Sequence, residues 1–449
     1  MTASHTGQSQ SELPMVHPHA AGLDIGLREI WACVPPTAAN PAVRPFSTFT
    51  PDLEALADWL QVCHIETVAM ESTGIYWIPI YDLLEARGLE VYLVNARHLK
   101  NVPGRKSDVQ DCQWIQRLHS YGLLNASFRP TAELCALRTY LRQRRMLIEY
   151  RAAHIQHMQK ALQQMNVQLT QVLSDITGET GLQIIRAIVA GQRDPVQLAH
   201  YRDPRCKHSQ DEVARALTGH YQPEHVFALT QALAAYDFYT AQIQACDDAM
   251  EQLYHQCPPA QEDLPPLPPS TKTNTHSKNA PTFDVRAELY RLTGVDLTAI
   301  DGLNASTAQE ILTEIGTHME KWPTDKHFCS WLHLAPHNAI SGGKVLSSHV
   351  LPGATRAAQA FRLGAQAVGK TDTALGVFYR RLRARLGPER AIVATAHKLA
   401  RLVYHLLKHH EPYTPVSPDV YEQALRQREV ANLTRRAKQL GFTVTPQPA

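Results

Sequence analysis

Short apolar runs that each end in one acidic residue limit what this chain can fold into. Asp24 follows Gly22-Leu23, and Glu71 follows Val68-Ala69-Met70. Runs this short, flanked by glycine or serine, are typical of buried strands that deliver one acid at a sheet edge. Asp108 and Asp111 are three residues apart, a spacing that puts both on one face of a predicted helix. The pattern predicts a cluster of four carboxylates.

Acids buried together without a partner would neutralise, whereas acids around a divalent cation stay charged. We therefore expect these four to bind Mg²⁺ or Mn²⁺ and to act on a phosphodiester, with two ions serving the attacking and leaving oxygens. Each acid alone has an ordinary alternative. Asp24 would suit a turn, Glu71 a helix cap, and Asp108 and Asp111 the first turn of a helix.

Residues 18–95 alternate strand-like and helix-like patterns. We expect a strand pair over 19–34 that turns at Gly26, further strands at 43–49, 67–71 and 90–94, and helices at 53–64 and 76–87. This order predicts an α/β domain that opens with a hairpin.

A seven-residue repeat then predicts a long helix with a coiled-coil seam. Its members are Leu134, Leu141, Ile148, Ile155, Leu162 and Leu169. The seam either joins two subunits or packs inside one. The stretch from Val226 to Leu253 is a candidate antiparallel partner, with residues 174–224 as the tip of the pair.

Charge is strongly segregated along the chain. Residues 1–96 carry three Lys/Arg against eleven Asp/Glu, residues 97–160 carry twelve against four, and residues 344–410 carry twelve against two. Basic blocks beside an acidic domain predict a polyanion held against a metal site, although they could also simply solvate long helices. The expected nucleic-acid contacts are Arg97, Lys100, Arg105, Lys106, Arg142, Arg144, Arg145, Lys344, Arg380 and Arg381.

Residues 258–284 are rich in proline and then in small polar residues, which predicts a mobile linker. Beyond it, the segment from Leu297 to Leu312 resembles a helix-hairpin-helix, with a plain helical hairpin as the alternative. Further on, Ser341-Gly342-Gly343-Lys344 offers a serine nucleophile, glycines for close approach and a cation for a phosphate. A flexible glycine turn is the ordinary reading, and Ser347 and Ser348 compete for the nucleophile role.

Other classes fit poorly. The eight cysteines include no C-x-x-C pair, which argues against a zinc ribbon and a disulfide scaffold. His405 and His409 lack the glutamate of an H-E-x-x-H zinc site. With no apolar run of 18 residues and no signal-like N-terminus, we expect a bacterial cytoplasmic, nucleoid-associated protein without a membrane partner.

Together these residues resemble the DEDD transposases, insertion-sequence recombinases with a RuvC-like domain that are associated with bridge-RNA guidance. Asp24, Glu71, Asp108 and Asp111 match the DEDD set in order and spacing. The segments from Ile300 to Gly316 and from Trp331 to Lys344 resemble the C-terminal transposase domain of that family. The run after Lys344 departs from the basic, glycine-containing run of many members, which keeps Ser348 open as a rival to Ser341.

The resemblance implies an RNase H-like (RuvC-like) fold, long coiled-coil helices and a mostly helical C-terminal transposase domain. It implies Mg²⁺-dependent DNA strand cleavage and exchange through a 5′-phosphoserine on Ser341. It also implies homodimers that assemble into a homotetramer, holding a structured guide RNA with target and donor DNA. The protein would then grip backbone shape while base pairing supplies sequence.

The corresponding domain prediction follows the chain in six parts. They are a disordered N-terminus (1–17), a RuvC-like DEDD catalytic domain (18–130), a coiled-coil dimerisation and nucleic-acid-binding region (131–257), a Pro-rich linker (258–285), a C-terminal transposase domain with the serine (286–410) and a C-terminal tail (411–449). Two rival functions were weighed. A Holliday-junction-type endonuclease would use the four acids and water alone, and an actin-like sugar kinase would need phosphate and adenosine loops that the chain lacks.

Overall fold

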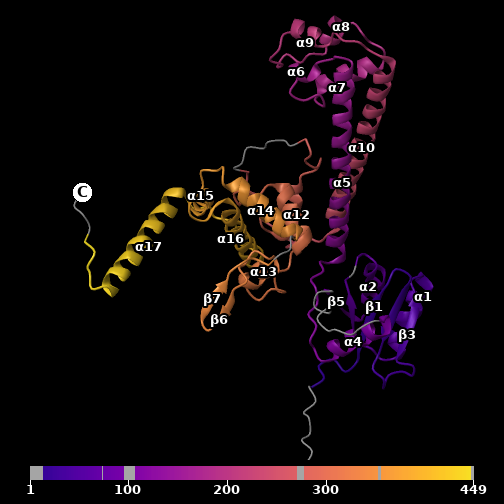
Figure 1. Ribbon diagram of the computed structural model, residues 1–449, viewed down its shortest axis with the longest axis vertical. Helices are drawn as coiled ribbons and strands as arrows, with labels where there is room; N and C mark the ends of the chain where they lie inside the picture. The colour runs from indigo at the N-terminus through magenta and orange to yellow at the C-terminus, as the bar shows by residue number, and fades with distance from the viewer. Residues whose placement is uncertain (1–13, 73, 96–106, 271–277, 352–354, 446–449) are drawn as a thin grey trace, which may run out of the picture. The chain divides into compact units, whose positions relative to one another are not determined.

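The computed structural model describes residues 14–72, 74–95, 107–270, 278–351 and 355–445 (Figure 1). The chain divides into two compact units, Met1–Arg129 and Pro130–Ala449. Each unit is described by itself. Of the helices in these ranges, none is both long and apolar enough to span a bilayer.

Unit 1 is built on a mixed five-stranded sheet in the order β3-β2-β1-β4-β5. Strands β1 (Ala20–Ile25), β2 (Glu29–Cys33) and β3 (Val43–Ser47) are antiparallel neighbours, whereas β4 (Thr67–Glu71) and β5 (Glu90–Val94) run parallel to β1. The helices are α1 (Thr50–Val62), α2 (Trp77–Ala86) and α4 (Asp108–Ser120). The predicted strands and helices are confirmed, and the mixed sheet is consistent with an RNase H-like domain.

The two faces of the sheet carry different layers. Ala21, Leu23 and Ile25 of β1 alternate onto the face whose core includes α1 and α2. The opposite face carries α4, whose Ile115 belongs to the same cluster as Ala69 of β4, Val94 of β5 and Leu124. The N-terminal end is anchored there too, because the Val16 and His17 amides both donate to the Ser120 carbonyl. The predicted disorder over 1–17 is therefore wrong for these two residues, while residues 1–13 lie outside the described chain.

Unit 2 begins with two long antiparallel helices, α5 (Ala132–Gln164) and α10 (Pro223–Gln256), that pack on each other. Leu147 of α5 packs with Ile243 and Cys246 of α10. The predicted antiparallel partner is therefore confirmed, and a large part of the seven-residue seam is filled within one chain.

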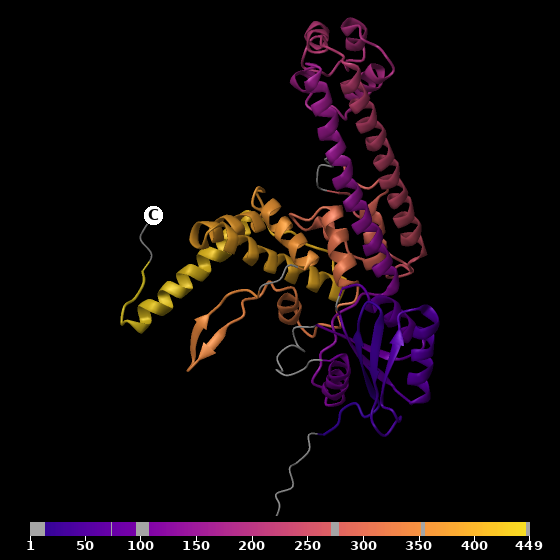
Figure 2. The same cartoon turned by 45° about the vertical axis from the view of Figure 1, so that its right-hand side comes forward.

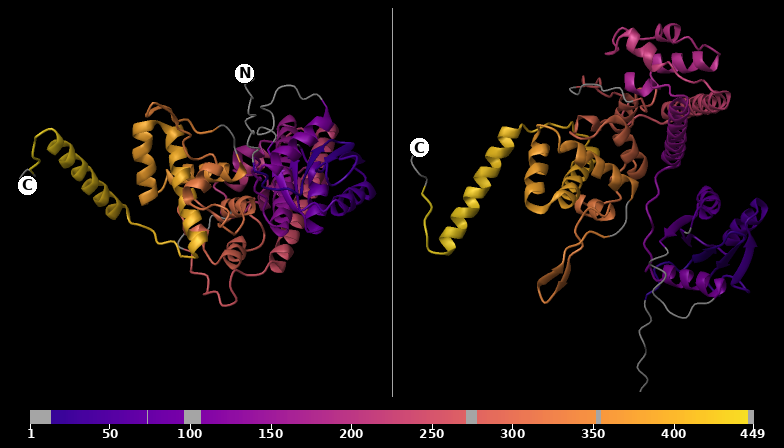
Figure 3. Two further views of the ribbon diagram at one scale, coloured as in Figure 1. Left: turned by 90° about the horizontal axis from the view of Figure 1, so that it is seen from below. Right: turned by 45° about the horizontal axis from the view of Figure 1, so that its top comes forward.

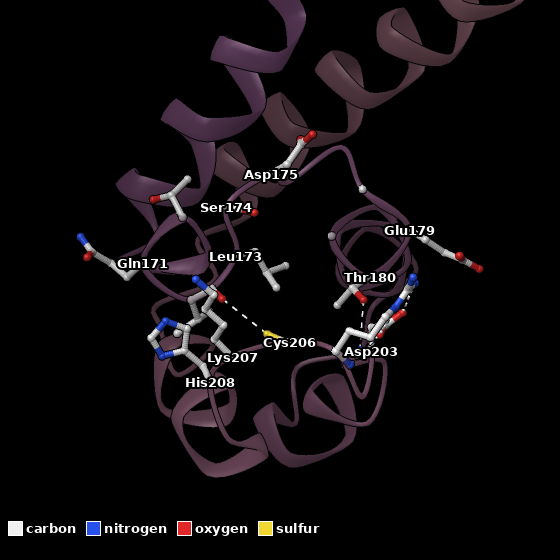
Figure 4. A pocket seen from close by; sticks show the side chains of 15 residues that line it. Gln171, Leu173, Ser174, Asp175, Glu179, Thr180, Asp203, Cys206, Lys207 and His208 are labelled. Carbon is white, nitrogen blue, oxygen red and sulfur yellow. Dashed lines mark hydrogen bonds and ion pairs between the residues drawn. The ribbon is translucent and has the colours of Figure 1, made fainter. Parts of the chain in front are cut away.

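Four short helices cap the far end of this hairpin: α6 (Leu169–Val172), α7 (Glu179–Val189), α8 (Pro195–Ala199) and α9 (Gln210–Ala216). An open cleft of about 600 Å³ is lined by α6, the start of α7 and the segment 203–208, with Ser174 and Lys207 among its lining side chains (Figure 4). The two ends of this tip meet, since the His220 amide donates to the Met165 carbonyl at 2.7 Å.

The rest of unit 2 is mostly helical, as expected. Its elements are α11 (Val285–Thr293), the 3₁₀ turn η1 (Leu297–Ala299), α12 (Ala305–Ile315), α13 (Asp325–Trp331), β6 (Ala339–Ser341), β7 (Lys344–Ser347), α14 (Arg356–Val368), α15 (Ala374–Leu386), α16 (Pro388–His409) and α17 (Pro418–Gln439). Asn304 caps α12 by accepting from the Thr307 amide. That this turn and helix bind nucleic acid as a helix-hairpin-helix stays a prediction.

Two segments differ from the sequence expectation. Described parts of the proline-rich segment are pinned rather than mobile, because Tyr290 donates to the Pro265 carbonyl and Arg144 donates to the Asn279 carbonyl. The predicted tail contains α17, a 22-residue helix with no buried residue that projects outward (Figure 3). It contacts its unit through the Arg381–Glu429 ion pair and through Lys398, which lies over the Tyr421 ring.

Candidate active site

Asp24 and Glu71 end neighbouring parallel strands. The β1–β4 register pairs Gly22 with Ala69 and Leu23 with Met70, so one further step sets Asp24 beside Glu71. Because side chains alternate along a strand, both acids lie on the face that carries α4. The adjacency predicted from two separate strand ends follows directly from this register.

Helix α4 brings the other two acids to the same sheet edge. It runs antiparallel to β1, because Gln116 Nε2 donates to the Ala20 carbonyl at 3.3 Å while the Cys112 carbonyl lies over Gly22. One turn further toward the helix N-terminus, the first turn carrying Asp108 and Asp111 reaches the level of Asp24. Ser107 caps this turn by accepting from the Gln110 amide.

Gly22 makes this approach possible. A Cβ atom there would lie 2.3 Å from the Gln116 amide nitrogen and 2.5 Å from the Cys112 oxygen, so a side chain would push α4 away. Sequence analysis gave no role to Gly22, Cys112 or Gln116. A glycine inside an apolar strand is the signal that could have suggested close packing at this point.

The four acids form one electrostatic cluster. The pKa of Asp24 is raised to about 6, chiefly by burial and then by the negative charges of Asp108, Asp111 and Glu71. A hydrogen bond from the Ile25 amide opposes the shift only in part. Three carboxylates around the half-buried Asp24 create a negative potential that favours a divalent cation.

In the described ranges, no three His, Cys, Asp or Glu side chains are gathered tightly enough to hold a metal ion. The donor set nevertheless suits Mg²⁺ or Mn²⁺, because hard cations prefer carboxylate oxygens and keep room for water or a phosphate. Asp24, Glu71, Asp108 and Asp111 are the residues that would hold it.

Ser341 belongs to unit 2, at the tip of a two-stranded ribbon (Figure 2). Ser341 pairs with Lys344 across a two-residue turn in which Gly342 and Gly343 have φ of 55° and 75°. Positive φ at both positions matches the tight hairpin turn that glycine favours. Ser341 and its rival Ser348 are both exposed, and Ser348 lies beyond the end of β7.

The predicted nucleic-acid contacts have different surroundings. Arg144 is buried and paired with Asp247 of α10, so its assignment to a nucleic-acid surface is wrong: the pair fixes the helix hairpin instead. The others within the described chain are Arg142 and Arg145, paired with Glu314 and Glu310, Arg380 and Arg381, paired with Asp372 and Glu429, and Lys344, which is exposed. Arg97, Lys100, Arg105 and Lys106 lie outside the described residues.

The raised pKa of Asp24 predicts a pH-dependent stability without divalent cations. The pKa of Asp24 is about 6 in the folded protein and about 4 in the unfolded chain, so its protonated form favours the folded state. This stabilisation, roughly 2–3 kcal/mol at most, is fully present below pH 4 and is lost as the pH rises through 6. In EDTA at pH 7.5, Asp24→Asn should therefore melt at a higher temperature than wild type. Mg²⁺ should raise the melting temperature of wild type more than that of the variant.

Differential scanning fluorimetry from pH 4 to 8 measures this difference. Glu66→Gln, at an exposed position just before β4, is the control and should keep the wild-type profile. Parallel profiles for wild type and Asp24→Asn would contradict the expected cluster.

Comparison with known families agrees with this geometry. A family model described as a transposase, of the DEDD IS110 type, matches residues 21–167, and a second, described as the transposase IS116/IS110/IS902 family, matches residues 296–380. The two matches cover just over half of the chain and include the four acids and Ser341. No curated protein matches the chain. The chain therefore belongs to the IS110-type DEDD transposase family, enzymes that cleave and recombine DNA.

Proposed function

We propose that this transposase mobilises its own insertion sequence by metal-dependent DNA cleavage and exchange through a covalent 5′-phosphoserine. The observation that carries the proposal is the convergence of Asp24, Glu71, Asp108 and Asp111 on one sheet edge, in the range that matches the DEDD model. Exposed Ser341, in the range of the second model, supplies the nucleophile.

The acids bind and orient the metal and the scissile phosphate. Bound Mg²⁺ or Mn²⁺ would polarise the phosphate and stabilise charge on the leaving oxygen. Because Asp24 is half-buried, water screens the electrostatic field of the acids less than it would at the surface. Gly22 keeps α4 close enough for Asp108 and Asp111 to take part.

Ser341 performs the covalent step. Its Oγ forms a bond to phosphorus while the bond from phosphorus to O3′ breaks, and the serine proton is balanced by protonation of the departing O3′. The products are a 5′-phosphoserine ester and a free 3′-hydroxyl. Attack by the 3′-hydroxyl of a second strand on the ester reverses these bonds and completes the exchange.

Variants of both groups test this chemistry. Asp24→Asn, Glu71→Gln, Asp108→Asn and Asp111→Asn should each reduce recombination of a donor and a target plasmid at least 100-fold while retaining DNA binding. Ser341→Ala should abolish the protein–DNA adduct on denaturing gels, and Ser348→Ala should retain it. If Ser341→Ala cleaves at the wild-type rate and no adduct forms with wild type, the water-dependent Holliday-junction nuclease replaces this proposal.

We further infer that the acids of one subunit act with Ser341 of another, in homodimers that assemble into a tetramer. An unpaired apolar stripe supports self-association. On α10, Phe227, Ala234, Phe238, Ala241 and Ala245 recur at intervals of seven, four, three and four residues on the side away from α5, and Phe227 and Phe238 are 66% and 58% exposed. This is the spacing of a coiled-coil seam.

A charge in this stripe should prevent self-association. Phe238→Glu should shift the mass measured by light scattering from oligomer to monomer, because an unpaired carboxylate would be buried at the seam. Ala228→Glu adds the same charge roughly a quarter turn away and should leave the oligomer intact. An unchanged mass for Phe238→Glu would exclude this seam.

We also propose a structured guide RNA as partner. Its support is the excess of basic residues in 97–160 and 344–410, with Arg142, Arg145 and Arg380 only partly screened by acids. The RNA would specify target and donor DNA by base pairing.

Purification from the native host followed by sequencing of co-purified RNA tests this partner. We expect one discrete RNA encoded beside the gene, retained at low salt and released at high salt. Recovery of only random fragments would instead indicate a protein-only recombinase.

A further inference from the structure

Three exposed apolar side chains follow the catalytic strand β4. Ile75, Tyr76 and Ile78 are 71%, 44% and 38% exposed, and they begin four residues after Glu71. Scattered exposed apolar residues are common on protein surfaces, but a group beside a cluster of catalytic acids indicates a partner that enters the site.

The turn that carries them is held in one conformation. Gly74 has φ of 61°, a value that suits glycine, and its carbonyl accepts from Trp77 Nε1 at 3.1 Å. The Ile78 amide donates to the Ile75 carbonyl, which closes the turn at the start of α2. The Tyr76 ring lies against Gly74, where an added Cβ would be 3.5 Å from the ring.

Neighbouring side chains hold the Trp77 ring in place. This ring meets Tyr81 edge to face at 5.7 Å, and the Arg129 guanidinium lies over both rings while pairing with Asp82. Arg129 is only 14% exposed. Ile75 and Tyr76 are therefore displayed by a rigid support, since rotation of Trp77 would break these contacts.

The turn also lies at the right edge of the sheet. It follows the carboxyl end of β4, which is parallel to β1, so it is at the edge where Asp24 and Glu71 meet. Ile75 and Tyr76 are therefore placed to contact the bases of a strand whose phosphate binds at this edge. Apolar and aromatic side chains in such positions insert between bases and stabilise an unstacked strand.

We propose that Ile75 and Tyr76 form a wedge that separates the two bases flanking the scissile phosphate. The wedge holds the strand open so that the phosphodiester can reach the half-buried acids. The ligand is thus an unstacked nucleotide step of DNA, recognised by stacking and not by base-edge hydrogen bonds. This assignment rests on the proposed recombinase function.

Base unstacking can be measured without chemistry. Full-length protein carrying Asp24→Asn, purified with any RNA it retains, is mixed with duplex DNA from the end of its insertion sequence. The DNA carries 2-aminopurine beside the cleavage position. Binding should increase the probe fluorescence several-fold. Adding Tyr76→Ala or Ile75→Ser should remove most of this increase at saturating protein, whereas Tyr76→Phe should keep it because the ring remains.

Val62→Ser is the matched control, because Val62 is 75% exposed at the end of α1, at the opposite edge of the sheet. In the catalytically competent protein, Tyr76→Ala should slow adduct formation about tenfold or more at saturating DNA without changing the melting temperature. An unchanged fluorescence increase in both wedge variants overturns the proposal. The proposal is also overturned if the wedge variants unstack the bases normally but form a smaller oligomer. That result would identify Ile75 and Tyr76 as a subunit contact.

The two proposals fail in different ways. If wild type forms no adduct, the recombinase chemistry is wrong, but the fluorescence experiment still reports whether the bases separate. If the adduct forms normally and the wedge variants behave like Asp24→Asn alone, only the wedge is wrong.

Discussion

The contact between α4 and β1 at Gly22 is the constraint on which the rest of unit 1 depends. Without a side chain at Gly22, backbone meets backbone, and the first turn of α4 is brought to the carboxyl ends of β1 and β4. Like charges that would repel one another are thereby held together, and their repulsion adds to the effect of burial in raising the pKa of Asp24. Packing of the sheet on its two helical layers provides the free energy that opposes it.

In the proposed mechanism, the reacting groups are divided between the two units. The acids belong to a rigid α/β layer, where strand register fixes their spacing. The serine belongs to a narrow ribbon of three- and four-residue strands with exposed side chains. Such a ribbon is narrow enough to enter a groove that would exclude a helix. Its tight Gly342-Gly343 turn restricts the positions that the Ser341 hydroxyl can take.

Sequence patterns predicted the helices, the strands and the α5–α10 pairing well, and individual side-chain contacts poorly. The strands of unit 1 were found because each is a short apolar run with clear ends, and the α5–α10 hairpin because its apolar residues repeat at helical spacing. Arg144 was misassigned because a count of charges along the sequence does not show that its partner is Asp247, 103 residues away. The position of Gly22 against α4 and the place of Ile75 and Tyr76 beside Glu71 depend on the three-dimensional arrangement of the sheet edge, which sequence periodicity does not reveal.

The closed base of the tip has a consequence for how this chain can change. Because Met165 and His220 are hydrogen-bonded where the tip joins α5 and α10, the intervening helices form a cassette whose two ends already touch. The entropy of closing a loop across such a short gap depends only weakly on loop length. Whole modules can therefore be exchanged, shortened or enlarged at this point without moving the helix pair, which makes the tip the natural place for this scaffold to diversify and for a foreign domain to be grafted.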